Sequence, residues 1–400
     1  MSDNKKVVLA YSGGLDTSFC VKYLTEEKGL DVYAITVNTG GFTKEQISDI
    51  ETRALYLGVK EYIAEDVTEA YYERCLKYLI FGNILKNNTY PLSVSAERVF
   101  QAIAVAEYAK SIGAKYIAHG STGAGNDQVR FDMIFNIVLP DAEIITPIRD
   151  LRLSREAEIE YLKTKGVEID AAKAVYSINQ GIWGTSVGGK ETLTSDQTLP
   201  ESAYPTQLTK NGTEDITISF EKGEPVALNG KKYNHPVELI QELSSIAGPY
   251  AIGRDTHVGD TIIGIKGRVG FEAAAPLIII KAHHLLEKHT LTKQQLNWKD
   301  MLANPYGNFL HEGLFYEPAM RDFEAFFTST QAHVTGDVTI RLQPYHFSTV
   351  GIQSPYDLMQ SKFGSYGEMN NAWSGEDVKG FSKIFSNQIM IHAKVKESIE

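Results

Sequence analysis

The chain has 400 residues, of which 43% are hydrophobic and 22% charged, and its formal net charge is −11. Because single domains usually have about 100–200 residues, we expect two or three domains. This composition excludes wholesale disorder, and no apolar run approaches the roughly 20 residues of a membrane-spanning helix. The acidic balance disfavours a nucleic-acid partner, and the N-terminus has no signal-peptide pattern, so we expect a cytoplasmic protein.

Predicted strands and helices alternate through the first part of the chain. Strands are predicted at 7–11, 32–37, 61–64 and 115–119, and helices at 16–27, 43–57 and 96–112. Thr43 and Gln46 have the spacing of a capping box at the second helix. The alternation predicts a doubly wound α/β domain over residues 1–166, with a parallel sheet covered by helices on both faces.

The pattern changes near residue 166. Residues 167–205 are rich in Gly, Ser and Thr and show little periodicity. Strands follow at 215–220, 225–228 and 337–342, with hairpin turns at 221–224 and 229–230 and a helix at 236–247. We therefore predict an α+β domain over 167–354 and an oligomerisation arm over 355–400. A lone helix at 379–396 would need to pack on the domain or on another subunit.

A glycine-rich loop, Ser12-Gly-Gly-Leu-Asp-Thr-Ser18, joins the first strand to the first helix. Adjacent glycines allow a tight turn, and the free N–H groups at the start of the helix suit a phosphate. Asp16 is expected to cap the helix and to reach a metal through water. The alternative is a plain strand-to-helix turn. Neither a Walker motif nor a G-x-G-x-x-G dinucleotide motif is present at this turn.

A second loop, 119–131, follows the strand at 115–119 and has the sequence His-Gly-Ser-Thr-Gly-Ala-Gly-Asn-Asp-Gln-Val-Arg-Phe. Thr122, Asn126, Asp127 and Arg130 offer donors, acceptors and both charges, which suits an amino-acid zwitterion. A long turn with an Asn-Asp helix cap would explain the glycines. It would not explain Thr122 together with Arg130.

The first loop resembles the pyrophosphate loop of the N-type ATP pyrophosphatases. The second is similar to the His-Gly-x-Thr-Gly-Lys-Gly-Asn-Asp-Gln-Val-Arg-Phe loop of the argininosuccinate synthases. Further matches spread this resemblance over most of the chain: 90–95, 176–177, 183–186, 253–254, 263–268 and 271–272. A tRNA thiolase of the same superfamily is the alternative, but it would need a catalytic cysteine pair, and Cys20 and Cys75 are poorly placed.

The resemblance implies a homotetrameric ligase of arginine biosynthesis that joins citrulline to aspartate. ATP and Mg²⁺ would be used, citrullyl-AMP would form, and AMP and pyrophosphate would be released. The implied ATP site is Ala10, Tyr11, Ser12, Gly13, Gly14, Leu15, Asp16, Thr17, Ser18, Val37 and Gly120. The implied aspartate site is Thr122, Asn126 and Asp127, and the implied citrulline site is Tyr90, Ser95, Asn126, Arg130, Ser177 and Ser186. No residue is assigned as the general base.

Four positions depart from the family pattern. Family members have Lys where Ala124 stands, Glu where Gly188 and Gly259 stand, and Tyr where Phe271 stands. Losing a carboxylate and a hydroxyl at the citrulline α-amino group removes charge-assisted binding and opens volume. We therefore hypothesise an N-acylated citrulline, such as N-acetyl- or N-succinylcitrulline, as substrate. The alternatives are a local shift of the alignment, or another carboxylate in place of the missing Glu: Asp255, Asp260 or Glu272.

Overall fold

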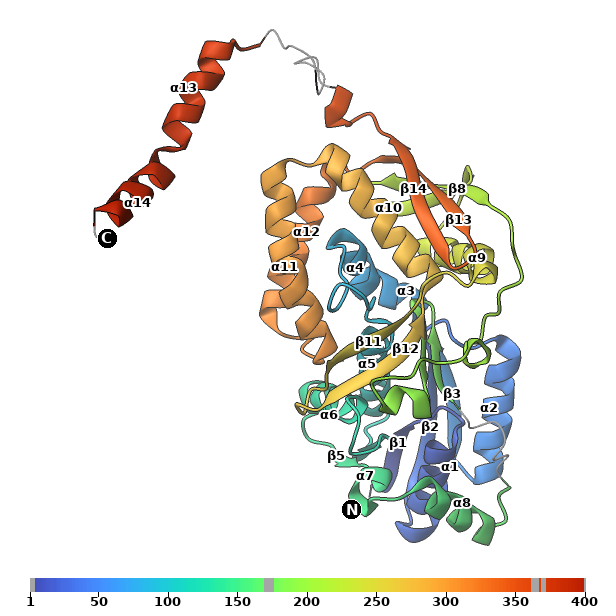
Figure 1. Ribbon diagram of the computed structural model, residues 1–400. Coiled ribbons are helices and arrows are strands. Elements are labelled where there is room, and N and C mark those ends of the chain that lie inside the picture. The colour runs from blue at the N-terminus through green and yellow to red at the C-terminus, as the bar shows by residue number, and fades with distance from the viewer. Residues whose placement is uncertain (1–3, 169–175, 361–366, 368–371, 399–400) are drawn as a thin grey trace.

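The computed structural model describes residues 4–168, 176–360, 367 and 372–398, and its first sheet is parallel (Figure 1). Five strands pair in the order β3-β2-β1-β4-β5. The predicted strands are confirmed, with these bounds: β1 (Lys6–Ala10), β2 (Asp31–Asn38), β3 (Glu61–Asp66), β4 (Tyr116–Ala118) and the additional β5 (Glu143–Ile145). All the pairings are parallel, which confirms the predicted doubly wound fold.

Helices cover both faces of this sheet. α1 (Leu15–Lys22), α2 (Lys44–Leu57) and α8 (Arg155–Thr164) enclose one apolar core with the side chains of β1. α5 (Ser93–Ser111) packs on the opposite face. The capping box predicted for α2 is present, and a π-helical turn (Tyr23–Glu27) extends α1 over the predicted length. The remaining helices of this part are α3 (Thr68–Tyr71), α4 (Lys77–Phe81), α6 (Asp127–Val138) and α7 (Pro147–Leu151).

The second part contains two antiparallel sheets. One has the order β10-β9-β8-β13-β14, with β8 (Glu214–Glu221), β9 (Glu224–Leu228), β10 (Lys231–Lys232), β13 (Gly336–Gln343) and β14 (His346–Gln353). Its predicted hairpin turns are confirmed by positive φ at Lys222-Gly223 and Asn229-Gly230. Four helices accompany it: α9 (Pro236–Ala247), which was predicted, α10 (Ala274–Thr290), α11 (Lys293–His311) and α12 (Pro318–Thr330).

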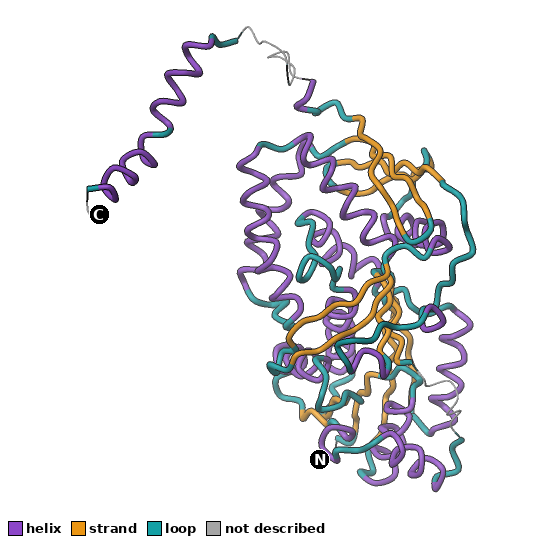
Figure 2. The backbone as a smooth tube through the Cα atoms, viewed as in Figure 1, coloured by secondary structure: helices purple, strands orange, loops and turns teal. Residues whose placement is uncertain are grey.

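The other sheet lies between the parallel sheet and the five-stranded antiparallel sheet (Figure 2). Its order is β11-β12-β7-β6, with β6 (Ser177–Gly181), β7 (Gly184–Gly188), β11 (Arg254–Asp260) and β12 (Lys266–Glu272). β6 and β7 lie in the segment that shows little periodicity, and we predicted no strand there. Glycines interrupt the apolar alternation there, and cross-strand pairing supplies the order instead. Residues 169–175 of that segment lie outside the described residues.

The hydrophobic core is continuous between the first two predicted domains. Tyr71 and Tyr72 follow β3, yet they belong to the same buried cluster as Phe220 on β8 and Ile278 on α10. α5 contributes its alanine-rich face to this cluster. The boundaries at 166 and 354 therefore stay predictions, since the buried side chains do not separate at the first of them.

The C-terminal helices α13 (Gly375–Phe385) and α14 (Asn387–Glu397) lie apart from the rest of the chain (Figure 1). They confirm the predicted helical segment. Neither has a buried residue, and they expose large apolar side chains: Val378, Phe381, Ile384, Phe385, Ile389 and Ile391. No helix in the described ranges is long and apolar enough to cross a membrane.

Candidate active site

The strand order places the site. β2 and β3 lie on one side of β1, and β4 and β5 lie on the other, so the connections diverge at the carboxyl ends of β1 and β4. A crevice forms at such a switch point in an open α/β sheet. The two glycine-rich loops follow these two strands and line one cavity of about 1090 Å³. That volume is at the upper end of the roughly 300–1,000 Å³ of single-ligand pockets, so more than one small molecule fits.

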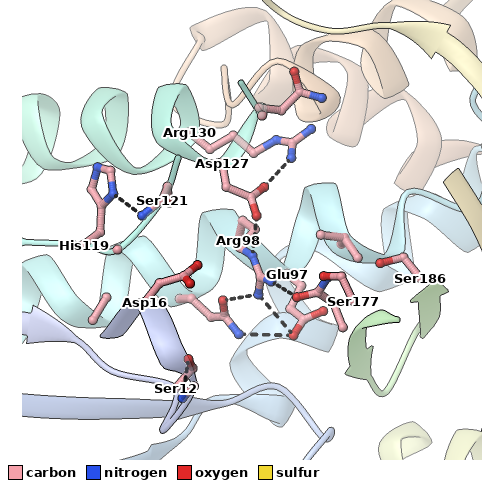
Figure 3. A pocket seen from close by; sticks show the side chains of 18 of the residues that line it. Ser12, Asp16, Glu97, Arg98, His119, Ser121, Asp127, Arg130, Ser177 and Ser186 are labelled. Atoms are coloured by element: carbon pink, nitrogen blue, oxygen red, sulfur yellow. Dashed lines mark hydrogen bonds and ion pairs between the residues drawn. The ribbon is translucent and has the colours of Figure 1, made fainter. Parts of the chain in front are cut away.

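Most of the residues named from the sequence line this cavity (Figure 3). All the implied aspartate and citrulline residues do, and so do all the implied ATP residues except Ser18. Gly259 lines it as well, whereas Phe271 does not. The residues come from segments far apart in sequence: the two loops, the end of β2, α5 with the residues before it, the β6–β7 hairpin and β11.

The first loop leaves the start of α1 free for an anion. Gly13 has φ +76°, and a Cβ at this position would lie 3.0 Å from Ile50 Cγ1, so glycine is required. The helix begins after Gly14, and no side chain caps it. Our expectation that Asp16 is the cap was wrong, because Asp16 lies inside the first turn. Ser18 Oγ donates to the Gly14 carbonyl (2.6 Å), so Ser18 holds the loop from behind.

The second loop approaches the first closely. A Cβ at Gly120 would lie 3.3 Å from Thr17 Cγ2, which explains a glycine here. His119 is buried, its Nδ1 accepts from the Ser121 N–H (3.2 Å), and its Nε2 lies 2.9 Å from Asp132 Oδ1. Since Nδ1 is an acceptor, Nε2 carries the proton and donates to Asp132. His119 therefore has a structural role that holds the entry of this loop.

Two arginines donate hydrogen bonds to the Asp127 carboxylate at the start of α6. Asp127 accepts from Arg98 Nε and from Arg130 Nη1, both at 2.9 Å. Burial acts to raise the pKa of Asp127, but the two guanidinium groups outweigh it and lower that pKa, so the carboxylate is charged. Asn126 Oδ1 accepts from the Ile262 N–H (2.8 Å), which ties this loop to the β11–β12 turn.

Tyr90, Ser95 and Arg130 converge with two histidines that the sequence analysis missed. Arg130 donates from Nε to the His311 carbonyl (2.9 Å) and from Nη2 to Ser95 Oγ (3.0 Å). The His257 ring stacks on Tyr90, with centroids 5.1 Å apart. Both histidines line the cavity. No motif surrounds either residue, so only the pairing of distant segments reveals them.

Charged residues on helices were missed as well. Glu97 on α5 is 3% exposed and accepts from Thr39 Oγ1 (2.6 Å) and Gln101 Nε2 (3.1 Å). Its burial raises the pKa of this carboxyl to about 7. Arg53 and Arg155 also line the cavity and can supply positive charge to it. A signal for Glu97 exists in the sequence, because a carboxylate interrupts an otherwise alanine-rich helix.

The departures from the family pattern differ in their surroundings. Gly259 pairs with Gly267 across β11 and β12 and faces the cavity. Phe271 is fully buried, 5.3 Å from the Tyr90 ring, so it supports Tyr90 from behind. Ala124 and Gly188 do not line the cavity.

Three carboxylates were considered as substitutes for the missing Glu. Asp255 and Glu272 do not line the cavity, and Glu272 accepts from Thr206 Oγ1 (2.8 Å). Asp260 does line it, but its carboxylate forms an ion pair with Lys266 (2.5 Å). Asp260 is therefore the remaining alternative of the three.

Comparison with known proteins agrees with this geometry. Residues 6–168 match the model described as arginosuccinate synthase N-terminal HUP domain, and residues 176–392 match the arginosuccinate synthase C-terminal domain. Proteins named argininosuccinate synthase are similar over nearly their whole length. The one from Dictyoglomus thermophilum is 39% identical over 97% of this chain and 98% of its own. Those from Methanocaldococcus jannaschii and Xanthomonas campestris are 38% and 35% identical, each over 98% of this chain and over 98% and 99% of their own. The chain therefore belongs to the argininosuccinate synthase family.

Proposed function

We propose that this protein ligates aspartate to a citrulline-type substrate at the expense of ATP. The observation that carries the proposal is the meeting of an uncapped helix start with a zwitterion-binding loop in one cavity. In the first step the ureido oxygen attacks the α-phosphorus, an O–P bond forms, and the bond from that phosphorus to the β-phosphate oxygen breaks. Pyrophosphate leaves, and citrullyl-AMP remains.

The chain contributes mainly binding and orientation to this step. A ureido oxygen is a weak neutral nucleophile, so positioning and charge stabilisation have to lower the barrier. The N–H groups at the uncapped start of α1 would face the phosphates, and Arg53 and Arg155 line the same cavity. These groups stabilise the pyrophosphate as negative charge develops on it.

The residues present fit Mg²⁺ beside the first loop. Asp16 lines the cavity, and next to it Glu158 is buried with its Oε2 unpartnered within the described chain. Burial, followed by the Asp16 carboxylate, raises the pKa of Glu158 to about 8. When bound, Mg²⁺ supplies positive charge to the phosphate oxygens. The described residues contain no cluster of three such ligands, so ATP would furnish the rest.

In the second step the aspartate amine attacks the ureido carbon of citrullyl-AMP. A C–N bond forms, the C–O bond to AMP breaks, and the amine loses a proton. Thr122, Asn126 and Asp127 would orient aspartate, while Tyr90, Ser95, Arg130, Ser177 and Ser186 would hold the citrulline part. Cys20 and Cys75 are buried outside the cavity, which argues against a thiolase.

The finer proposal concerns the α-nitrogen of the citrulline substrate. Gly259 brings no carboxylate to the cavity, and the Asp260 carboxylate is engaged by Lys266. A positively charged α-ammonium thus lacks its usual partner, whereas an acylated nitrogen is neutral and needs none. We therefore propose that an N-acylated citrulline is the preferred substrate. A homotetramer held by the C-terminal helices, a role in arginine biosynthesis and a cytoplasmic location complete the proposal.

Pyrophosphate release by the full chain with ATP, Mg²⁺ and aspartate tests both the ligase proposal and the proposed N-acyl preference. Citrulline, N-acetylcitrulline and N-succinylcitrulline are added separately, and AMP is measured in parallel. Release that depends on aspartate and on one of the three supports the ligase. No release with any of them refutes it. Release mainly with free citrulline keeps the ligase and refutes the N-acyl preference.

A further inference from the structure

We propose that His257 and His311 form a subsite that hydrogen-bonds the amide group of an N-acylated substrate. The inference rests on the proposed function and deepens it, since it names the residues that would distinguish an amide from an ammonium. It depends on three features of the cavity: the His257 imidazole that fills the volume beside Gly259, the unpartnered ring nitrogens, and a smaller adjoining cavity.

The His257 imidazole occupies the volume that a side chain at position 259 would need. A Cβ built on Gly259 would lie 2.6 Å from His257 Nε2, closer than real Cβ contacts. Because both residues project from the same face of β11, the imidazole and a glutamate at 259 exclude one another. His257 is fixed in this place by its stacking on Tyr90, with an interplanar angle of 26°.

Each histidine brings an unpartnered buried nitrogen to this place. Both residues are 6% exposed; within the described chain His257 Nδ1 has no hydrogen-bond partner, and His311 Nε2 has none of good geometry, although the Asp260 backbone carbonyl lies close enough to raise the His311 pKa. Buried polar atoms nearly always have partners, so two such atoms on residues that line this cavity point to a ligand. The rings lie 6.5 Å apart between centroids. An amide, with one N–H donor and one carbonyl acceptor, can satisfy both.

The tautomer of His311 follows from its neighbours. Arg130 Nη2 donates to Ser95 Oγ (3.0 Å), so the Ser95 hydroxyl is left to donate to His311 Nδ1, at 3.0 Å. His311 Nδ1 is therefore an acceptor, and Nε2 carries a proton. This N–H suits an acyl carbonyl oxygen. It cannot accept from an ammonium.

Both imidazoles are neutral near pH 7. Burial, followed by the charge of Arg130, lowers the pKa of His311 to about 3. Burial and the nearby Lys86 lower the pKa of His257. The Asp260 backbone carbonyl acts to raise the pKa of His311, but its effect is smaller than that of burial and Arg130. The positive charges around the pair disfavour a second ammonium and leave a neutral amide unaffected.

A smaller cavity of about 210 Å³ adjoins this subsite and gives room for an acyl chain. It shares Asp260, Thr261 and His311 with the large cavity. Lys86 also lines it and donates from Nζ to Asn308 Oδ1. None of the ion pairs found among the described residues includes Lys86. An acetyl group would leave this lysine untouched, whereas the carboxylate of a succinyl group would reach toward it.

Variants of the two histidines test the assignment. His257→Phe keeps a ring on Tyr90 but removes both nitrogens. His311→Asn keeps an acceptor for Ser95 but removes Nε2, and His311→Gln places an amide near that position. We expect His257→Phe and His311→Asn each to lower kcat/KM for N-acylcitrulline by about 3- to 10-fold, as for one lost neutral hydrogen bond. His311→Gln should recover most of the loss, and the exposed His346→Asn serves as control.

The measurements are kcat/KM for N-acetylcitrulline, N-succinylcitrulline and citrulline, with KM for ATP and aspartate. A loss confined to the N-acyl substrates, with KM for ATP and aspartate unchanged, supports the subsite. Equal losses for acylated and free citrulline, or no loss, overturn it while the ligase proposal stands. A wild-type preference for free citrulline also overturns it. A wild type that is inactive with all three refutes the proposed function itself.

Discussion

Placing at position 259 the carboxylate that the resemblance implies should convert the proposed substrate preference, but only when His257 is removed as well. Gly259 does not have a positive φ, so its backbone accepts a side chain. In Gly259→Glu alone, however, the new Cβ would lie 2.6 Å from His257 Nε2 and displace the ring from Tyr90. We expect that single variant to lose activity with N-acylcitrulline and to gain little with citrulline.

The double variant His257→Ala/Gly259→Glu should gain activity with free citrulline. A charge-assisted hydrogen bond to the α-ammonium contributes about 1.5–3 kcal/mol, which corresponds to roughly 10- to 150-fold in kcat/KM for free citrulline. Turnover of N-acetylcitrulline should fall in the same variant, because the carboxylate faces an uncharged amide and the imidazole is gone.

Pyrophosphate release over a range of each citrulline form is the assay, and the ratio of the two kcat/KM values is the readout. In the control variant His257→Ala/Gly259→Gln, the new side chain has nearly the volume of glutamate but no charge, so activity with free citrulline should not rise. Gly351→Glu, on β14 in open space, controls for an added glutamate elsewhere. The reasoning is refuted if the double variant keeps the wild-type ratio, or if Gly259→Glu alone matches it without loss of N-acyl turnover.

Three further predictions concern stability and assembly. Lys299 and Glu287 form a fully buried ion pair. Lys299→Met should therefore lower the free energy of unfolding, measured in urea, by about 3–5 kcal/mol, and Lys299→Met/Glu287→Gln should recover most of that loss. An equal loss in both variants would contradict this prediction. Burial raises the pKa of Glu97 to about 7 in the folded state. The protonated carboxyl therefore contributes its full stabilisation below about pH 4.5, and the free energy of unfolding falls by up to about 3 kcal/mol as the pH rises through 7. Glu97→Gln should remove that fall, and a pH dependence identical to wild type would count against the assignment. Truncation after Gln360 removes the exposed helices α13 and α14 and should dissociate the proposed tetramer. Size-exclusion chromatography with light scattering measures the mass, and an unchanged mass would disprove the role of these helices.

Local sequence was informative wherever one short segment makes a structure by itself. The phosphate-type loop, the capping box at Thr43 and the hairpin turns at 222–223 and 229–230 each depend on backbone preferences within a few residues. The α/β alternation similarly predicted the parallel sheet, because buried strands and amphipathic helices have different periods. Ser18 and Phe271 mark the limit of this reasoning: both belong to family motifs, yet neither reaches the cavity.

Sequence alone thus determined the fold class, the family and the two loops that line the cavity, because each depends on contiguous residues. Only the tertiary structure decided that His257 on β11 and His311 at the end of α11 share one cavity, and that an imidazole fills the space beside Gly259. The physical reason is that hydrogen-bond satisfaction and packing are properties of residues brought together by the fold. A glycine in a strand shows that a side chain is absent, and only the packed structure shows which neighbour took its volume.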